Sequence, residues 1–384
     1  MLMKSIYKQN ISNFIKKFIY KIISLFNIFP IEDNKIVFIN GHSSNIEGNI
    51  KVISEEVMKD YPNYKVIIYY KDDVEFKLKH IFKYIRTSYN ILTAKFIILN
   101  DYVSLFSNVK VRKNCKMIQV WHAGGAFKRF GIDSLQNINN INNMKKCIAC
   151  HSQYDKVIVS SRIVKKIYAN AFSINESKIY PLGLARADKF YDERFINETK
   201  KNFLEKYSNL KNKKIILYAP TYRDGQIKEF NLKLDLEYLY RNLSSGYVIV
   251  TKLHPFIKNG IDIPLGLSDR ILNLSHEDID ELMISSDLLI TDYSSIIFEY
   301  AIMEKPIIFF AYDLQEYNNN LRGFYYSYEE FVPGIIVKNT KEIVNIITKD
   351  VWDYKNIRKF KNKFNEYNDG KATKRIVENI LQDI

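Results

Sequence analysis

The feature that most constrains the fold is a regular alternation of short apolar, β-branched runs with helical stretches, which begins after Pro30. Helical patterns at 52–59, 163–171 and 295–303 separate such runs. This alternation predicts parallel, doubly wound sheets, and two sets of about five strands fit two Rossmann-like domains. The predicted strands are residues 35–39, 65–70, 96–100, 117–121, 157–160, 215–218, 248–252, 271–274, 288–291 and 306–310.

Length and composition agree with two folded domains. The chain has 384 residues, of which 47% are hydrophobic and 26% charged, so a disordered chain is excluded. Its three cysteines exclude a disulfide scaffold. A polar stretch at 191–212 separates the two sets of strands. We therefore expect a helical segment at 1–30, one Rossmann-like domain at 31–195 and a second at 196–384.

The charge balance predicts an anionic partner. Lys and Arg total 57 against 43 Asp and Glu, a net charge of +14. Nucleic acid, an acidic membrane and a phosphate-rich substrate are the candidates, and the alternative is that the lysines only maintain solubility. No zinc finger, RRM or helix-turn-helix signature is evident, so nucleic acid is not expected. Basic residues gather near the N-terminus and at 358–363.

The first thirty residues contain five lysines and no acidic residue. Lysines interrupt the segment too often for a membrane span, and no secretory cleavage pattern is present. The pattern predicts a helix lying on an anionic membrane surface; the alternative is an amphipathic helix packed on the protein. The helical period places one apolar set together, opposite polar residues that include Tyr20. That set is Ile11, Phe14, Ile15, Phe18, Ile19, Ile22, Leu25 and Phe26.

Histidines and glycines follow two of the predicted strands directly. In open α/β sheets, ligands bind beyond the carboxyl ends of strands. His122 follows strand 117–121 and is well placed for a general base, while Gly124 and Gly125 let backbone amides approach a ligand. His254 follows strand 248–252, beside Lys252.

Other strand ends carry donors suited to phosphate. Thr221 and Arg223 supply a hydroxyl and a guanidinium. Ser294 and Ser295 start a helix, where serines either cap the backbone or bind an anion. Arg186 is a further phosphate ligand or a salt-bridge partner of Asp188.

Cys147 and Cys150 form a CxxC without a second pair, so we treat them as ordinary thiols and expect no metal site.

Taken in order, these motifs resemble the CDP-glycerol glycerophosphotransferases, the teichoic acid primases and polymerases. The resemblance runs from about Asn40 to Gly334. It rests on Trp121-His122, 183–186, 218–224, His254-Pro255, 286–295, 305–310, 312–314 and 322–325.

The resemblance implies a GT-B fold, with an acceptor-side N-terminal domain and a CDP-donor-binding C-terminal domain facing a cleft. It implies transfer of glycerol phosphate, or a related alditol phosphate, from a CDP-alditol to a hydroxyl, with release of CMP. The acceptor would be a lipid-linked or polyanionic chain in the synthesis of teichoic acid or a capsule-like polymer. No cofactor is implied, since the CDP-alditol is a substrate. Family members lie peripherally on the cytoplasmic face of the membrane.

The matching positions imply a set of cleft residues. By hypothesis His122 is the general base, His254 acts on the donor phosphates and Glu299 accepts from ribose hydroxyls. Thr221, Ser294 and Ser295 would hold the pyrophosphate, and Arg186 would offset its charge. The full implied set is His122, Arg186, Pro220, Thr221, Lys252, His254, Ser294, Ser295 and Glu299.

The first motif departs from the common family pattern. From Trp121 to Lys128 it is one residue longer and lacks the usual Thr and Pro, which looks closer to the ribitol-phosphate branch. CDP-ribitol is therefore an alternative donor to CDP-glycerol. A GT-B glycosyltransferase using a nucleotide sugar is the other enzymatic alternative, and a basic membrane- or nucleic-acid-binding protein is the non-enzymatic one. The basic cluster at 358–363 would steer a polyanionic acceptor.

Overall fold

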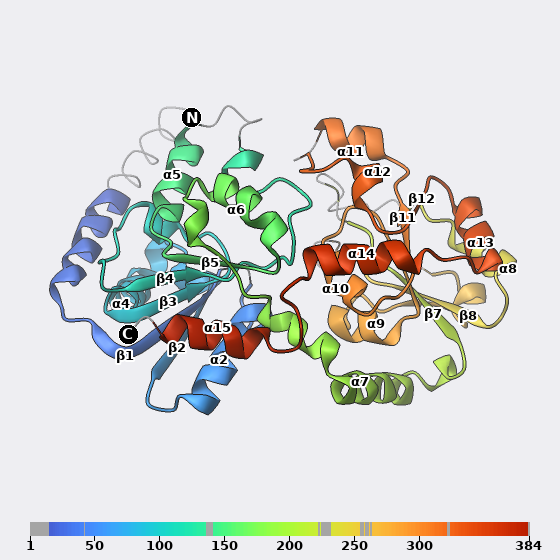
Figure 1. The fold of residues 1–384 in the computed structure, drawn as a ribbon, viewed down its shortest axis with the longest axis horizontal. Helices are drawn as coiled ribbons and strands as arrows, with labels where there is room; N and C mark the ends of the chain where they lie inside the picture. Colours follow the sequence, from blue (N-terminus) through green and yellow to red (C-terminus); the bar gives the residue numbers. More distant parts are fainter. Residues whose placement is uncertain are drawn as a thin grey trace. The chain divides into compact units, whose positions relative to one another are not determined.

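The computed structural model describes residues 15–41, 43–135, 141–221, 223, 232–253, 257, 261, 263–320 and 323–382, with the main chain alone at 318–320. The chain forms two compact units. The first consists of Met1–Ala123, Phe130–Arg186 and Tyr367–Ile384, and the second of Gly124–Arg129 and Ala187–Glu366. Each unit is an α/β sandwich around one parallel sheet (Figure 1).

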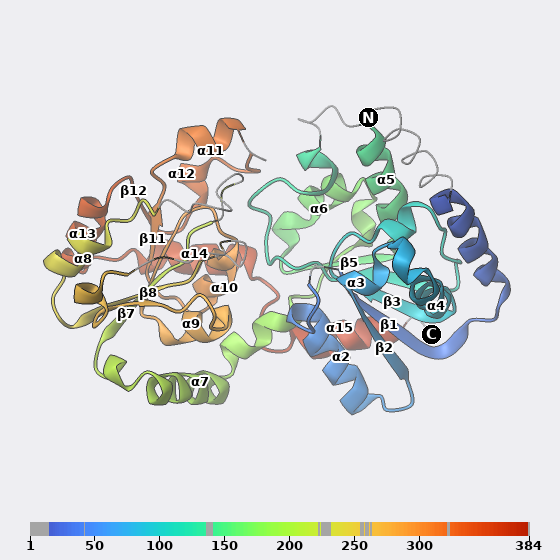
Figure 2. The ribbon, with the colours of Figure 1, turned by 180° about the vertical axis from the view of Figure 1, so that it is seen from behind.

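The sheet of the first unit has six parallel strands in the order β2-β1-β3-β4-β5-β6. Most residues of its central strands are buried, and these strands lie between helices on both faces (Figure 2). The strands are β1 (Glu32–Asn40), β2 (Lys65–Tyr70), β3 (Ala94–Leu99), β4 (Lys116–Gln119), β5 (Lys156–Val159) and β6 (Ile179–Pro181). The helices are α2 (Gly48–Asp60), α3 (Lys71–Val74), α4 (Ile81–Leu92), α5 (Ile141–His151), α6 (Lys165–Phe172) and the C-terminal α15 (Ala372–Leu381).

The second unit repeats this architecture with the strand order β12-β11-β10-β7-β8-β9, again all parallel. Its strands are β7 (Lys214–Tyr218), β8 (Tyr247–Thr251), β9 (Ile271–Asn273), β10 (Leu288–Thr291), β11 (Ile307–Phe310) and β12 (Ile335–Val337). Its helices are α7 (Glu193–Lys206), α8 (Leu236–Asn242), α9 (Ile279–Ser285), α10 (Ile296–Ile302), α11 (Leu314–Asn320), α12 (Tyr328–Phe331), α13 (Thr340–Lys349) and α14 (Tyr354–Phe364).

All ten predicted strands occur, with ends shifted by a few residues at most. Strands β6 and β12 were not predicted. Each has three residues and pairs with one neighbour only; β6 contains Pro181, and the apolar residues of β12 are too few to show a strand period. The predicted strand 117–121 ends early because Trp121 adopts a φ of 45°, a left-handed conformation that breaks strand geometry.

The two units divide the chain differently from the expected boundary at 195/196. The first unit ends at Arg186, and the chain returns to it at Tyr367. The return adds α15, whose buried Ile376 and Ile380 pack into the same core as β1 and α2. Residues 124–129 also belong to the second unit rather than to the expected N-terminal domain.

The N-terminal segment is helical over its described residues 15–24. Ile19, Tyr20 and Ile23 are buried in the first unit, so Tyr20 does not lie on the exposed polar face that the sequence predicted. Phe18 and Leu25, expected beside Ile19, are instead 58% and 61% exposed. Ile15, Ile22 and Phe26 are partly buried, and residues 1–14, which include the predicted positions Ile11 and Phe14, lie outside the described residues. Among the described residues, no helix is long and apolar enough to cross a membrane.

Candidate active site

The predicted donor-binding residues of the second unit gather at one edge of its sheet. Pro220 and Thr221 follow β7, Lys252 follows β8, and Ser294 and Ser295 follow β10. These three strands are adjacent and parallel, so their carboxyl ends share one edge. The arrangement is that of nucleotide-binding sites in doubly wound sheets.

Asp292 ties the loops after β7 and β10 together. Its Oδ1 accepts from the backbone N–H of Thr221 at 2.8 Å and from that of Tyr293. These two bonds hold the main chain of Thr221 close to that of Tyr293, the residue before Ser294. The Thr221 Oγ1 is buried and has no hydrogen-bond partner among the described residues, so it remains available to a ligand.

Arg223 has a different position from the one expected of a phosphate ligand. Arg223 is 7% exposed, and its guanidinium donates to Asp292 Oδ2 at 2.9 Å and to Asp313 Oδ2 at 2.8 Å. Its Nη1 also donates to the Thr221 carbonyl at 2.6 Å. Burial alone would lower the pKa of Arg223, but the Asp292 and Asp313 carboxylates together outweigh it and raise the pKa above its usual value. These contacts make Arg223 a buried tie between loops.

Lys252 is likewise engaged by the protein. Its Nζ donates to the carbonyls of Ser275 and Glu277 at 2.7 and 2.6 Å. Burial lowers the pKa of this ammonium. The described contacts therefore fix the turn after β9 to the end of β8. His254 lies outside the described residues.

The start of α10 carries the remaining predicted donor ligands. Ser295 is exposed and forms no side-chain cap, and Ser294 Oγ accepts only a long 3.4 Å bond from the N–H of Ile296. The hydroxyls are thus not committed to strong capping. Glu299, one turn further along the helix, is 2% exposed.

The glycine motif after His122 enters the second unit. Phe127 stacks on Phe324 and Phe331, with ring centroids 4.9 and 4.7 Å apart. Gly125 packs so closely that a Cβ there would lie 2.1 Å from the Phe298 ring. This close packing supplies a structural reason for Gly125, whereas the sequence suggested only ligand approach.

His122 belongs to the first unit, at the carboxyl end of β4. Its ring stacks on Trp121 with centroids 4.4 Å apart, and Nδ1 lies 3.1 Å from the Asn100 carbonyl. A carbonyl can only accept, so Nδ1 carries the proton in this bond. In a neutral ring the basic lone pair is then on Nε2, as a general base requires.

Asn49 is a site residue that the sequence reasoning missed. It is buried at the start of α2, and its amide donates to the carbonyls of Val120 and Trp121 at 3.0 and 2.9 Å. Its Oδ1 accepts from the backbone N–H of Arg186 at 3.0 Å. One side chain therefore joins the His122 and Arg186 segments. In the sequence, only the position of Asn49 after the first predicted strand could have indicated that it belongs to the site.

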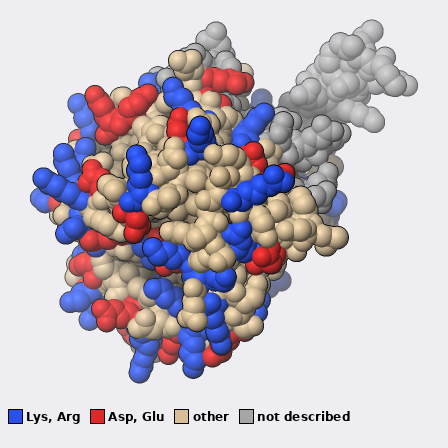
Figure 3. Space-filling model, turned by 90° about the vertical axis from the view of Figure 1, so that its right-hand side faces the viewer, with Lys and Arg blue, Asp and Glu red and all other residues tan. Residues whose placement is uncertain are grey.

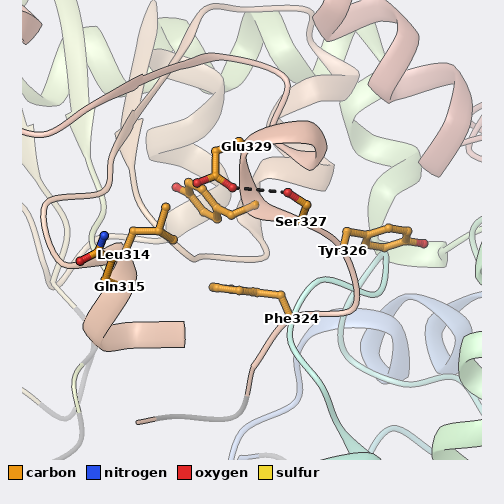
Figure 4. A pocket seen from close by; sticks show the side chains of 7 residues that line it. Leu314, Gln315, Phe324, Tyr326, Ser327 and Glu329 are labelled. Atoms are coloured by element: carbon orange, nitrogen blue, oxygen red, sulfur yellow. Dashed lines mark hydrogen bonds between the residues drawn. The ribbon is translucent and has the colours of Figure 1, made fainter. Parts of the chain in front are cut away.

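A cavity of about 450 Å³ lies beside the loop after β10 (Figure 4). Its lining includes Phe324, Tyr326 and Glu329, with Ser327 Oγ 3.4 Å from a Glu329 carboxylate oxygen. Tyr328, which also lines it, donates to the Asp292 carbonyl at 3.0 Å. Aromatic faces with hydroxyl and carboxylate groups suit a polyol.

Neither CxxC cysteine resembles a reactive thiol. Cys150 is buried, and desolvation raises its pKa to about 12; burial also raises the pKa of Cys147. The adjacent His151 is 2% exposed, and burial lowers its pKa to about 4.

Comparison with known proteins decides the family. The family described as CDP-glycerol:poly(glycerophosphate) glycerophosphotransferase matches residues 21–382. The chain belongs to this family. The predicted family is thus confirmed.

Several relatives are teichoic acid enzymes. The teichoic acid poly(ribitol-phosphate) polymerase of Bacillus spizizenii is 36% identical over 93% of this chain and 58% of its own length. The teichoic acid glycerol-phosphate primase of Bacillus subtilis is 32% identical over 87% of this chain and 90% of its own length. The chain thus spans little more than half of the polymerase and nearly all of the primase.

Solved structures confirm the predicted fold. The wall teichoic acid polymerase TagF, in a histidine variant soaked with CDPG, matches with a TM-score of 0.81 and 27% identity. The match covers 98% of this chain and 96% of that one. The two Rossmann-like units described above are therefore those of a GT-B-like fold.

Proposed function

We propose that the protein transfers an alditol phosphate from a CDP-alditol to a hydroxyl of a teichoic acid-type acceptor and releases CMP. The observation that carries this proposal is the family match over residues 21–382. The relatives include both ribitol-phosphate and glycerol-phosphate enzymes, so both CDP-ribitol and CDP-glycerol are candidate donors.

The second unit supplies the donor side of this proposal. The Thr221 hydroxyl and the exposed Ser295 at the start of α10 lie at adjacent strand ends, where hydroxyls donate to phosphate oxygens. Hydrogen bonds of Arg223 and Asp292 join the loops after β7 and β10. Pro220, Lys252, His254 and Glu299 remain proposed donor-site residues on the family resemblance.

The first unit supplies the acceptor side. His122, with its Nδ1 proton held by Asn100, would take the proton of the attacking hydroxyl at Nε2. Phosphoryl transfer leaves the protein mainly to align the attacking oxygen and to stabilise charge. Arg186 would supply a positive charge to the pyrophosphate, and Asn49 fixes its backbone.

A donor panel tests the proposal. The purified full-length protein is offered CDP-glycerol, CDP-ribitol and UDP-sugars separately with a lipid-linked acceptor. We expect CMP release with at least one CDP-alditol and no UDP release. UDP release without CMP would show a nucleotide-sugar glycosyltransferase and overturn the proposal.

We further propose a peripheral position on the cytoplasmic face of the membrane. The outward side of helical segment 15–24 combines Lys17 and Lys21 with Phe18, which is 58% exposed. Leu25 and Ile28 follow, at 61% and 77% exposed. Cations beside exposed apolar groups favour an anionic interface. A K17Q/F18S/K21Q variant should lose co-sedimentation with phosphatidylglycerol vesicles; unchanged sedimentation would contradict this position.

A further inference from the structure

The described residues of the second unit show no broad basic patch on the face drawn in Figure 3. On the face drawn in Figure 3, Lys and Arg side chains are interspersed with Asp and Glu. The basic cluster at 358–363 is itself divided: Arg358 and Lys361 pair with Glu304, at 3.6 and 2.9 Å. A polyanion site requires lysines without such acidic partners.

Three lysines of this kind line one cavity. Lys233, Lys338 and Lys341 surround a space of about 620 Å³, together with Tyr238 and Tyr312. All three lysines are exposed, and none of their ammonium groups forms a hydrogen bond or ion pair with a described residue. We call this space the lysine cavity.

Asp235 is an acidic residue on the lining of the lysine cavity, and it is already engaged. Its Oδ1 caps α8 by accepting from the N–H of Tyr238 at 2.9 Å. Its own N–H donates to Thr340 Oγ1 at 3.0 Å, which joins the starts of α8 and α13 (Figure 1).

Lys341 lies in the first turn of α13, where the helix dipole disfavours a cation. A second carboxylate, that of Glu342, lies beside the lining and accepts from the N–H of Lys338 at 2.8 Å and from the Asn339 amide at 2.7 Å. Three cations against these two carboxylates leave the cavity positive.

The lysine cavity lies on the same sheet edge as the donor loops. Tyr312 follows β11, and Lys338 follows β12. Strand β11 lies between β12 and β10, and β10 leads into the loop that carries Ser294. Neighbouring strands lie about 4.8 Å apart, so the end of β12 is about 10 Å from that of β10. A chain with regularly spaced phosphates can reach both places at once.

We propose that the lysine cavity binds a phosphodiester of the growing polyol-phosphate acceptor. This inference rests on the proposed function, because it assigns an acceptor subsite to the same enzyme. A polymer with one negative charge per repeat fits a cluster of unpaired lysines, and the tyrosine rings offer apolar faces to the polyol carbons. The cavity thus gives the enzyme a hold on chains that are already phosphorylated.

The test compares two double variants of equal charge change in the full-length protein. K338Q/K341Q removes two lysines of the cavity, and K349Q/K355Q removes two exposed lysines at the far end of α13 and the start of α14. The probe is a dye-labelled oligo(glycerol phosphate) of defined length, measured by fluorescence anisotropy. We expect K338Q/K341Q to bind it about three- to tenfold more weakly and K349Q/K355Q less than about twofold more weakly.

The outcomes separate the possible explanations. An unchanged dissociation constant in K338Q/K341Q, or an equal loss in both variants, would overturn the inference. Loss of binding to phosphatidylglycerol vesicles with intact oligomer binding would instead show a membrane contact, and would also overturn it. An unchanged KM for the CDP-alditol in K338Q/K341Q supports it. If the wild type released no CMP from any CDP-alditol, the proposed function would fail, whereas the binding comparison would still report on the cavity.

Discussion

Arg223 shows at the scale of one residue how the donor edge is held together. It bridges the loops after β7, β10 and β11 through Asp292 and Asp313, and Tyr293 also donates to Asp313 at 2.9 Å. Removing its charge would leave two carboxylates uncompensated, at a cost of about 3–5 kcal/mol. We expect R223M to lower the free energy of unfolding by this amount in urea titrations.

The milder D313N variant keeps Asp292 paired and serves as the control for R223M. It should lose less stability, and its KM for the CDP-alditol should rise because the loops are less well positioned. Wild-type stability and KM in both variants would show that Arg223 is not the tie described here.

His122 is the proposed general base for the attacking hydroxyl. Its loss removes the proposed base, and general bases contribute about 10²–10⁴-fold in rate. H122A should therefore lower kcat for CMP release by that factor with little change in melting temperature. The matched control is H80A, an exposed histidine on the first unit. Near-normal turnover in H122A would exclude the role.

At the scale of an element, His151 at the end of α5 makes stability depend on pH. Burial lowers its pKa to about 4, although a hydrogen bond with the Phe172 backbone opposes this. An unfolded histidine has a pKa of about 6.5, so between these values the unfolded state binds more protons. Stability should fall by about 3 kcal/mol as the pH drops from 6.5 to 4. Thermal melts of H151L should show a shallower acid dependence; an identical dependence would contradict this.

Gly125, in segment 124–129, packs directly against the Phe298 ring. G125A would place a Cβ against Phe298, and overpacking of this kind typically costs about 1–3 kcal/mol. Trimming the ring in G125A/F298L should restore part of the melting temperature and of CMP release. If glycine served only ligand approach, the double variant would recover stability alone or nothing.

The longer strands and the polar residues at their ends could be predicted from the sequence. Hydrogen-bond partners that are distant in the sequence could not. The central strands are β-branched runs, and Thr221 and Ser294 lie in the loops that follow β7 and β10. Asn49 and Asp313 act through bonds to residues 137 and 90 positions away, which leave no local pattern. The edge strands β6 and β12 were missed because each has only three residues, too few to show a strand period, and because β6 contains Pro181.

At the scale of the whole molecule, the chain's return at Tyr367 decides which unit the C-terminus stabilises. Amphipathicity predicts that α15 buries one face but not which sheet it covers. Its Ile376 and Val377 are 1% exposed and share a core with Ile50 of the first unit. By contrast, Ile357 on α14 is buried in the second unit, where α14 packs against α10.

Two matched truncations separate these assignments. Ile→Ala at a buried site costs about 2–5 kcal/mol, and opening of a unit raises hydrogen exchange in its own core. I376A should speed amide exchange in β1 and α2 and leave β10 protected, whereas I357A should do the reverse. Faster exchange of β10 in I376A, with β1 unchanged, would show that α15 belongs to the second unit. The expected pattern would mean that loss of the last helix weakens the unit that carries His122.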